Sequence, residues 1–343
     1  MRKKLIMLLL VLCLCMSTFI GCAVGSKDTG AAGEEAETKA PAKELSIVCT
    51  IFPQYDWVKE ILGARADQAE LTLLLDNGVD LHSYQPTAED IAKIASCDLF
   101  IYVGGESDQW VKDALSEATN KNMKVINLLE VLGDSIREEE IVEGMEAEAE
   151  ESGGAGHEED GEEEAEYDEH VWLSLKNAEV ICKSIEATLT ELDSQHKKEY
   201  EENLSAYEEK LSALDLAYQK TVDGAKQNTL LFGDRFPFRY LVEDYGMDYY
   251  AAFVGCSAET EASFETIVFL AEKTDELKLP AICVLESSDQ QIAKTIITNT
   301  KAKNQKVLVL DSMQSVTADD VAKGEKYLNI MNHNLEVLKE ALY

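Results

Sequence analysis

The sequence lacks the short motifs that mark common catalytic and thiolate metal sites. No CxxC pair, HExxH segment or GxSxG segment occurs in its 343 residues. Positive charge is also scarce, because 31 Lys and Arg stand against 66 Asp and Glu, for a formal net charge of -35. Nucleic-acid binding needs clustered Lys and Arg, so this composition argues against it. The natural partner for such a negative field is a cation.

Cysteine use also argues against a disulfide framework. Five Cys remain after the first 22 residues, an odd number with no close spacing. They are Cys49, Cys97, Cys182, Cys256 and Cys283. Cys49 and Cys283 sit inside apolar runs, so we expect them to be buried small hydrophobic residues. The sequence assigns no chemical role to the other three.

The N-terminal residues resemble the secretion signal of a bacterial lipoprotein. A basic start precedes an uncharged apolar stretch that is short for a membrane span. Cys22 follows Gly21 at its end, as in a lipobox, where the Cys is lipidated and becomes the mature N-terminus. We therefore expect a signal peptide over residues 1–21, a lipid anchor at Cys22 and a flexible tether over residues 22–44. The protein would lie on the extracytoplasmic face of the cell membrane; the alternative is an ordinary signal peptide with a chance Cys.

Short apolar runs alternate with segments of helical periodicity through the rest of the chain. The predicted strands cover residues 45–51, 71–75, 99–103 and 124–128, and then 229–232, 249–253, 281–285 and 306–310. Such alternation is typical of βαβ units and parallel sheets. We therefore expect two similar α/β domains with parallel sheets, over residues 45–193 and 225–343.

Two features separate these domains. From Asn177 to Val222 there is neither Gly nor Pro, and we expect a long rigid linker helix over residues 194–224. Such a helix would resist wide hinge closure. The second feature is an acidic segment over residues 138–169, with 17 Asp or Glu and no Lys or Arg. We interpret it as a mobile loop that gathers cations without supplying a tightly binding ligand; a passive solvated insertion is the alternative.

Histidine is the scarcest candidate ligand, with five residues in the chain. They are His82, His157, His170, His196 and His333. His82 lies in a turn between a predicted strand and a helix, and His170 lies where the acidic segment meets folded chain. Loops after the strands of α/β folds are common ligand sites. Imidazole and carboxylate together suit zinc or manganese, so position makes His82 and His170 candidate metal ligands; the alternative for each is a structural histidine whose hydrogen bonds are satisfied.

The segments around these histidines resemble the zinc- and manganese-binding lipoproteins of bacterial ABC metal importers. The first is GVDLHSYQPT, which contains His82, and the second is HVWL, which begins at His170 and is followed by Asn-Ala. The resemblance runs from about Leu45 to the end, outside the acidic segment. It implies the two-domain fold with its long helix, one metal ion bound by both histidines in a cleft between the domains, and a monomer that delivers the metal to an ABC permease.

The resemblance also implies ligands from the C-terminal half. Acidic motifs at Glu286 and Asp311 resemble a pair in the family, and Asp311 would be the third ligand. Where the family has another ligand, ten residues before a Tyr-Gly pair, this chain has Arg235, which cannot bind a cation. Asp234 or water would then complete the site. We expect Arg235 to turn away and pair with Glu286 or Glu259; in the alternative it pairs with Asp311 and closes the site.

These observations predict a solute-binding lipoprotein that captures zinc, or otherwise manganese, and that is not an enzyme. The charged segment before His170 favours zinc, because some zinc members of the family carry a charged loop there. Two alternatives stay open at this stage. One is an anchored adhesin or scaffold with a vestigial cleft, and the other is a zinc hydrolase with Glu286 as general base. Stoichiometric metal binding without turnover would exclude the hydrolase.

Overall fold

A computed structural model describes residues 44–146, 166–257 and 261–343. The expected signal peptide, the anchor at Cys22 and His157 lie outside the described residues. These described residues form one compact unit. Among the described residues, no helix combines the length and the apolar character needed to cross a bilayer.

The first lobe is built on a parallel sheet with the strand order β2-β1-β3-β4. The strands are β1 (Ser46–Cys49), β2 (Glu70–Leu73), β3 (Leu99–Tyr102) and β4 (Lys124–Asn127), and the helices are α1 (Phe52–Leu62), α2 (Ala88–Ser96), α3 (Val111–Ser116) and α4 (Leu128–Leu132). The two central strands are apolar and almost wholly buried, as expected for strands covered on both faces. Their apolar runs are the ones that the sequence identifies as strands.

The second lobe repeats this plan with the strand order β6-β5-β7-β8. Its strands are β5 (Thr229–Phe236), β6 (Asp248–Val254), β7 (Ala281–Leu285) and β8 (Lys306–Leu310), and its helices are α7 (Arg239–Tyr245), α8 (Phe264–Leu277), α9 (Gln291–Asn299), α10 (Ala318–Ala322) and α11 (Tyr327–Leu342). All pairings in both sheets are parallel. The prediction of two parallel α/β domains is therefore confirmed, and β2 and β6 are equivalent edge strands.

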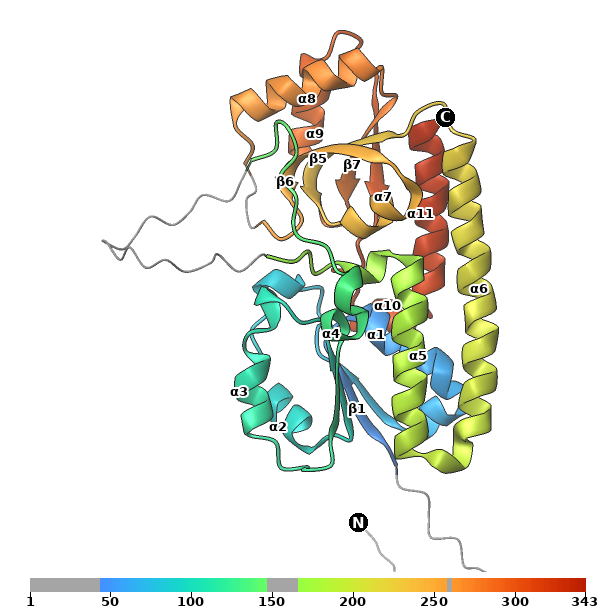
Figure 1. Cartoon of the computed structure of the whole chain (residues 1–343). Coiled ribbons are helices and arrows are strands. Elements are labelled where there is room, and N and C mark those ends of the chain that lie inside the picture. Colours follow the sequence, from blue (N-terminus) through green and yellow to red (C-terminus); the bar gives the residue numbers. More distant parts are fainter. Residues whose placement is uncertain (1–43, 147–165, 258–260) are drawn as a thin grey trace, which may run out of the picture. The chain divides into compact units, whose positions relative to one another are not determined.

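Two long helices accompany the sheets (Figure 1). They are α5 (Leu175–Leu192) and α6 (Lys197–Asp223), separated by the short turn Ser194–His196. The 27 residues of α6 span about 40 Å at the usual rise per residue. One side of α6 is a buried stripe of Leu and Tyr at helical spacing. Through it α6 packs on α5, α1 and α11, so the predicted long helix is confirmed and contacts elements of both lobes.

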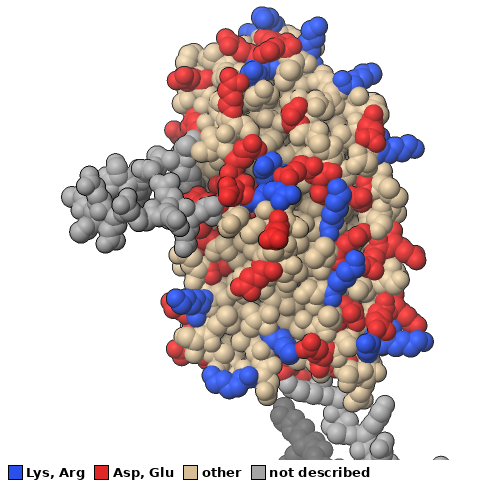
Figure 2. All heavy atoms as spheres, viewed as in Figure 1, with Lys and Arg blue, Asp and Glu red and all other residues tan. Residues whose placement is uncertain are grey.

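The lobes share most of their hydrophobic core. One continuous cluster includes Ile47 of β1, Tyr207 of α6 and Leu342 of α11. A smaller cluster lies beneath α8 and α9 and includes Leu231 and Ile296. Cys49 and Cys283 are buried as expected, and burial raises the pKa of Cys283 to about 12. On the face shown in Figure 2, acidic and basic side chains are interspersed.

Candidate metal centre

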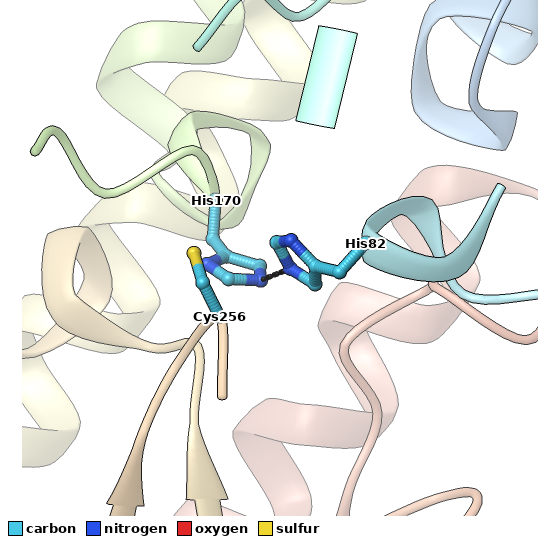
Figure 3. Close-up of side chains that lie close together, drawn as sticks. All are labelled: His82, His170 and Cys256. Carbon is cyan, nitrogen blue, oxygen red and sulfur yellow. Dashed lines mark hydrogen bonds between the residues drawn. The ribbon is translucent and has the colours of Figure 1, made fainter. Parts of the chain in front are cut away.

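The two histidines singled out by the sequence meet in the structure (Figure 3). His82 lies in the 3-10 turn Leu81–Ser83, on the chain that leaves β2, and His170 directly precedes the turn Val171–Leu173 that leads into α5. Their Nε2 atoms are 3.1 Å apart. Two ring nitrogens at this separation share at most one proton between them, or they can bind one metal ion.

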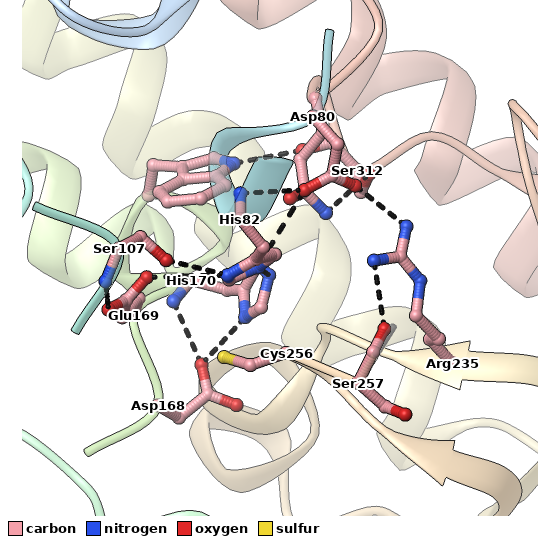
Figure 4. Close-up of polar contacts among 12 residues, drawn as sticks. Asp80, His82, Ser107, Asp168, Glu169, His170, Arg235, Cys256, Ser257 and Ser312 are labelled. Atoms are coloured by element: carbon pink, nitrogen blue, oxygen red, sulfur yellow. Dashed lines mark hydrogen bonds and ion pairs between the residues drawn. The ribbon is translucent and has the colours of Figure 1, made fainter. Parts of the chain in front are cut away.

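Polar partners hold each ring by its other nitrogen (Figure 4). The Nδ1 atom of His82 is 2.8 Å from the Ser107 hydroxyl. The Nδ1 atom of His170 is 3.1 Å from Oδ1 of Asp168, which also accepts a hydrogen bond from the His170 backbone N–H at 2.8 Å. A carboxylate at Nδ1 fixes the ring orientation and leaves Nε2 for a metal. His170 is therefore held in an orientation that suits a metal-binding histidine.

Burial and charge move the pKa values of the two rings apart. Burial, followed by the neighbouring His170, lowers the pKa of His82 to about 3. Burial alone would lower the pKa of His170 too, but the Asp168 carboxylate, together with Glu169 and Asp80, raises it. A metal that binds both Nε2 atoms must displace the proton between them, so metal binding is coupled to proton release.

A third side chain, Cys256, completes the cluster (Figure 3). Its Sγ atom and one ring nitrogen from each histidine all lie within 4.8 Å of one another. Within residues 44–146, 166–257 and 261–343, no other group of three or more His, Cys, Asp or Glu side chains has this geometry. Cys256 follows β6, and the sequence analysis missed it because it has no nearby Cys. Its position directly after a predicted strand is the signal that could have found it.

The two predicted carboxylate ligands do not belong to this cluster. Asp311 follows β8 and accepts a hydrogen bond from the backbone of Met313 at 2.7 Å. Burial and the nearby Glu286 raise the pKa of Asp311 to about 7. Asp234 instead accepts hydrogen bonds at 2.9 Å from the next backbone N–H and at 3.3 Å from that of Leu285. Metal binding by Asp311 and Asp234 therefore stays a prediction.

Arg235 ties the two lobes together next to this cluster (Figure 4). Its Nη2 atom is 2.7 Å from Oδ2 of Asp80, and its Nη1 atom donates to the carbonyl oxygen of Ser257 at 3.2 Å. Asp80 precedes His82 by two residues, and Ser257 follows Cys256. Burial alone would raise the pKa of Asp80, but the Arg235 guanidinium lowers it. Arg235 thus holds the loops that carry His82 and Cys256.

The expected pairing of Arg235 with Glu286 was wrong. It pairs with a carboxylate, as predicted, but that carboxylate is Asp80 and not Glu286. Glu286 accepts hydrogen bonds from the backbone and hydroxyl of Ser312, both at 2.9 Å, so it is already engaged. The alternative pairing with Asp311 is not what the structure shows either, and Glu259 lies outside the described residues.

The ends of the acidic segment line a cavity beside the histidines. This cavity has a volume of about 240 Å³ and is lined by His82, Glu106, Ser107, Glu139, Glu166, Tyr167, Glu169 and Cys256. The two ends of the segment pair with each other through a bridge between Glu138 and Tyr167. The interpretation of residues 138–169 as one mobile loop is therefore wrong at its ends. The acidic side chains there form a negative approach to the cluster, with Glu169 buried at 3.5 Å from Nδ1 of His82.

These features define a class of protein. Two parallel α/β lobes of equal strand order share a core along one long helix, and a His-His-Cys cluster lies where their loops meet. This is the architecture of a two-lobed binding protein. Residues 47–341 match the family described as "Zinc-uptake complex component A periplasmic". The chain belongs to this family.

Known relatives are similar in sequence and fold. The chain is 33% identical over 297 residues to the zinc-binding lipoprotein AdcA of Streptococcus pneumoniae serotype 4, which covers 87% of this chain and 56% of AdcA. It therefore spans about half the length of that relative. The high-affinity zinc uptake system protein ZnuA of Bacillus subtilis is 28% identical over 313 residues, 91% of this chain and 92% of ZnuA.

Solved structures show the same fold. The Zn(II)-bound ZnuA-like domain of AdcA from S. pneumoniae superposes with a TM-score of 0.67 at 30% identity, over 88% of this chain and 99% of that domain. The metal-dependent lipoprotein YcdH from B. subtilis has a TM-score of 0.69 at 26% identity, over 87% of this chain and 99% of its own. The family resemblance and the fold predicted from the sequence are confirmed.

Proposed function

We propose that this protein captures zinc outside the cytoplasm and delivers it to an ABC permease. The observation that carries the proposal is the 3.1 Å approach of the Nε2 atoms of His82 and His170. Each ring is held at its Nδ1 atom, so the two Nε2 atoms face each other and can bind one ion once the proton between them is released. Zinc accepts imidazole nitrogen at about 2.0–2.1 Å and commonly has four ligands. The names of AdcA and ZnuA, which describe zinc binding and zinc uptake, support this choice.

Manganese is the second candidate metal. It prefers carboxylate, carbonyl and water oxygen, so it would need oxygen ligands such as Asp311 and Asp234. For either to reach a metal, its carboxylate would have to leave the backbone N–H groups that it now binds. Zinc binding would require less side-chain rearrangement, because the side chains that already converge are two imidazoles and a thiol.

The test is metal analysis followed by calorimetry on the full chain. Protein purified without chelator should contain zinc, and metal-free protein should bind one zinc per chain more tightly than manganese. Replacement of His82 by Ala should weaken zinc binding strongly. A wild-type protein that binds no zinc at micromolar concentration would overturn the proposal.

The membrane anchor is a separate part of the proposal. Cys22 would carry acyl chains, each contributing about 0.8 kcal/mol per buried CH₂. Cys22→Ala should release the protein from the membrane fraction, while zinc affinity should stay unchanged because the metal cluster lies elsewhere. Detergent partitioning equal to that of the wild type would show that Cys22 is not the anchor.

The acidic segment would assist capture. Deleting residues 148–164 keeps the ends that line the cavity and removes a concentrated negative charge. We expect slower zinc association at low salt, an effect that shrinks as salt screens the field. Equilibrium affinity should change by no more than a few fold. A collapse of affinity would mean that the deleted residues include a ligand.

A further inference from the structure

We propose that Cys256 is the third zinc ligand and that this thiolate makes the site selective for soft metals. The inference rests on the proposed function, because it assumes that zinc is the cargo. It adds a ligand from the second lobe, so that a bound ion would join the two lobes directly.

The distances suit a shared metal ion. Zinc bonds of about 2.0–2.1 Å to nitrogen and about 2.3 Å to sulfur place neighbouring tetrahedral ligands roughly 3.3–3.6 Å apart. The two Nε2 atoms are already 3.1 Å apart. The Cys256 Sγ atom and one ring nitrogen from each histidine lie within 4.8 Å of one another, so a metal that draws the three side chains closer would have three corners of a tetrahedron.

The strand order places Cys256 where a ligand is expected. β2 and β6 are the equivalent edge strands of the two sheets. His82 lies on the chain that leaves β2, and Cys256 lies on the chain that leaves β6. Each lobe thus delivers one ligand from the same position in its own sheet.

Gly255 allows the Cys256 loop to approach the histidines. A Cβ atom at Gly255 would lie 2.9 Å from the carbonyl oxygen of Phe236 and 3.1 Å from Cε1 of His170. The first distance is too short for a real side chain. Only glycine therefore lets this backbone lie against the His170 ring.

Arg235 occupies the position at which the family has a ligand in the second lobe. Its guanidinium has no lone pair for a metal. A ligand from this lobe would therefore come from another position. The guanidinium spans Asp80 and the Ser257 carbonyl, the neighbours of His82 and Cys256 in the chain. Arg235 thus positions the ligands without being one, and Cys256 is the second-lobe member of the ligand group found among the described residues.

A thiolate changes which metals the site accepts. On binding, the S–H bond breaks, the sulfur donates its electron pair to zinc and the proton passes to solvent. Thiolate ligands select zinc and similarly soft ions, whereas manganese prefers oxygen. Zinc and cadmium should therefore gain affinity from Cys256, and manganese should gain little.

Cobalt(II) tests the bond directly, because a cobalt–thiolate bond gives an intense charge-transfer band in the near ultraviolet. Full-length wild-type protein loaded with cobalt should show this band. Cys256→Ser and Cys256→His should lose it, while Cys256→His should keep much of its zinc affinity. Cys182→Ala, which removes a buried thiol from α5, is the matched control and should keep the band.

Zinc calorimetry separates this inference from the proposed function. Cys256→Ala should weaken zinc binding at least about tenfold and leave manganese binding nearly unchanged. If the wild type binds zinc but Cys256→Ala binds it equally well, or if the cobalt band persists in Cys256→Ser, the ligand assignment fails and the proposed function stands. If the wild type binds no zinc, both fail.

Discussion

The two lobes have the same strand order but meet the candidate metal centre with different chemistry. The first lobe and the segment before α5 present two imidazoles, each held by a polar partner at its Nδ1 atom. The second lobe presents a thiol and a guanidinium. The sheet order determines where loops converge, and the side chains on those loops can differ between the lobes. A family pattern that holds in one lobe therefore does not guarantee the ligands of the other.

The largest expected effect comes from removing a ligand of the first lobe. His170→Ala should lower zinc affinity by more than about a hundredfold, because loss of a ligand exceeds the 10–100-fold cost of losing its outer partner. Competition against a chromophoric chelator would measure this. His333→Ala, at an exposed position, is the control. Equal affinity in both variants would remove His170 from the site.

A smaller effect should follow from removing the carboxylate that orients His170. Asp168→Asn should lower zinc affinity about tenfold at pH 8, since the ring loses the carboxylate that orients it. The same change removes the charge that raises the pKa of His170. Protons then compete less with zinc, so the affinity of the variant should fall less steeply below neutral pH than that of the wild type. Parallel pH profiles would contradict this role for Asp168.

Arg235 bridges the two lobes, so its replacement tests the contribution of the second lobe to the site. Arg235→Ala leaves the Asp80 carboxylate without its partner and should lower the free energy of unfolding by about 1–3 kcal/mol. Zinc affinity should fall a few fold, because the loops that carry His82 and Cys256 would no longer be joined through Arg235. Denaturant titration and calorimetry would measure both.

Two further variants sharpen the result for Arg235. Zinc binding that appears or rises strongly in Arg235→His would mean that Arg235 blocks the site. Asp234→Ala should have little effect on zinc affinity if Cys256 is the ligand, whereas a sharp loss would assign Asp234 to the metal.

The smallest expected effect concerns a buried acid of the first lobe. Asp108 accepts two backbone hydrogen bonds through Oδ2, while its buried Oδ1 has no hydrogen-bond partner among the described residues. Burial raises its pKa to about 7. The folded state therefore binds more protons than the unfolded state between about pH 4 and 7, and this group lowers stability as pH rises through that range. Asp108→Asn should be more stable than the wild type at pH 8, by on the order of 1 kcal/mol, and not at pH 4. Thermal melts at both pH values would show it.

The sequence predicted elements whose signals are local. The apolar run at residues 281–285 coincides with β7, and the stretch without Gly or Pro coincides with α5 and α6. The predicted strand at residues 229–232 is too short, because β5 continues to Phe236. After an irregularity beyond Phe232 its pairing with β6 resumes, and this pairing depends on a distant segment. The predicted strand at residues 124–128 ends one residue late, where α4 begins.

The residues of the candidate site also divide into those with a local sequence signal and those without one. His82 and His170 were found because each lies in a local motif. Cys256 has no such motif, and its role depends on the approach of two loops from different lobes. The partner of Arg235 was missed for the same reason, since Asp80 lies 155 residues away in the chain. Contacts across the lobes follow from how the sheets are placed, which no window of sequence contains.

The shared core along α6 has a thermodynamic consequence. Because one hydrophobic cluster runs through both lobes, neither can lose its packing alone, and we expect a single cooperative melting transition for the bulk of the chain. Zinc bound where the lobes meet would raise the midpoint of that whole transition. The small cluster beneath α8 and α9 is separate. Amide hydrogens there should exchange through a local opening of lower free energy, ahead of those in α6.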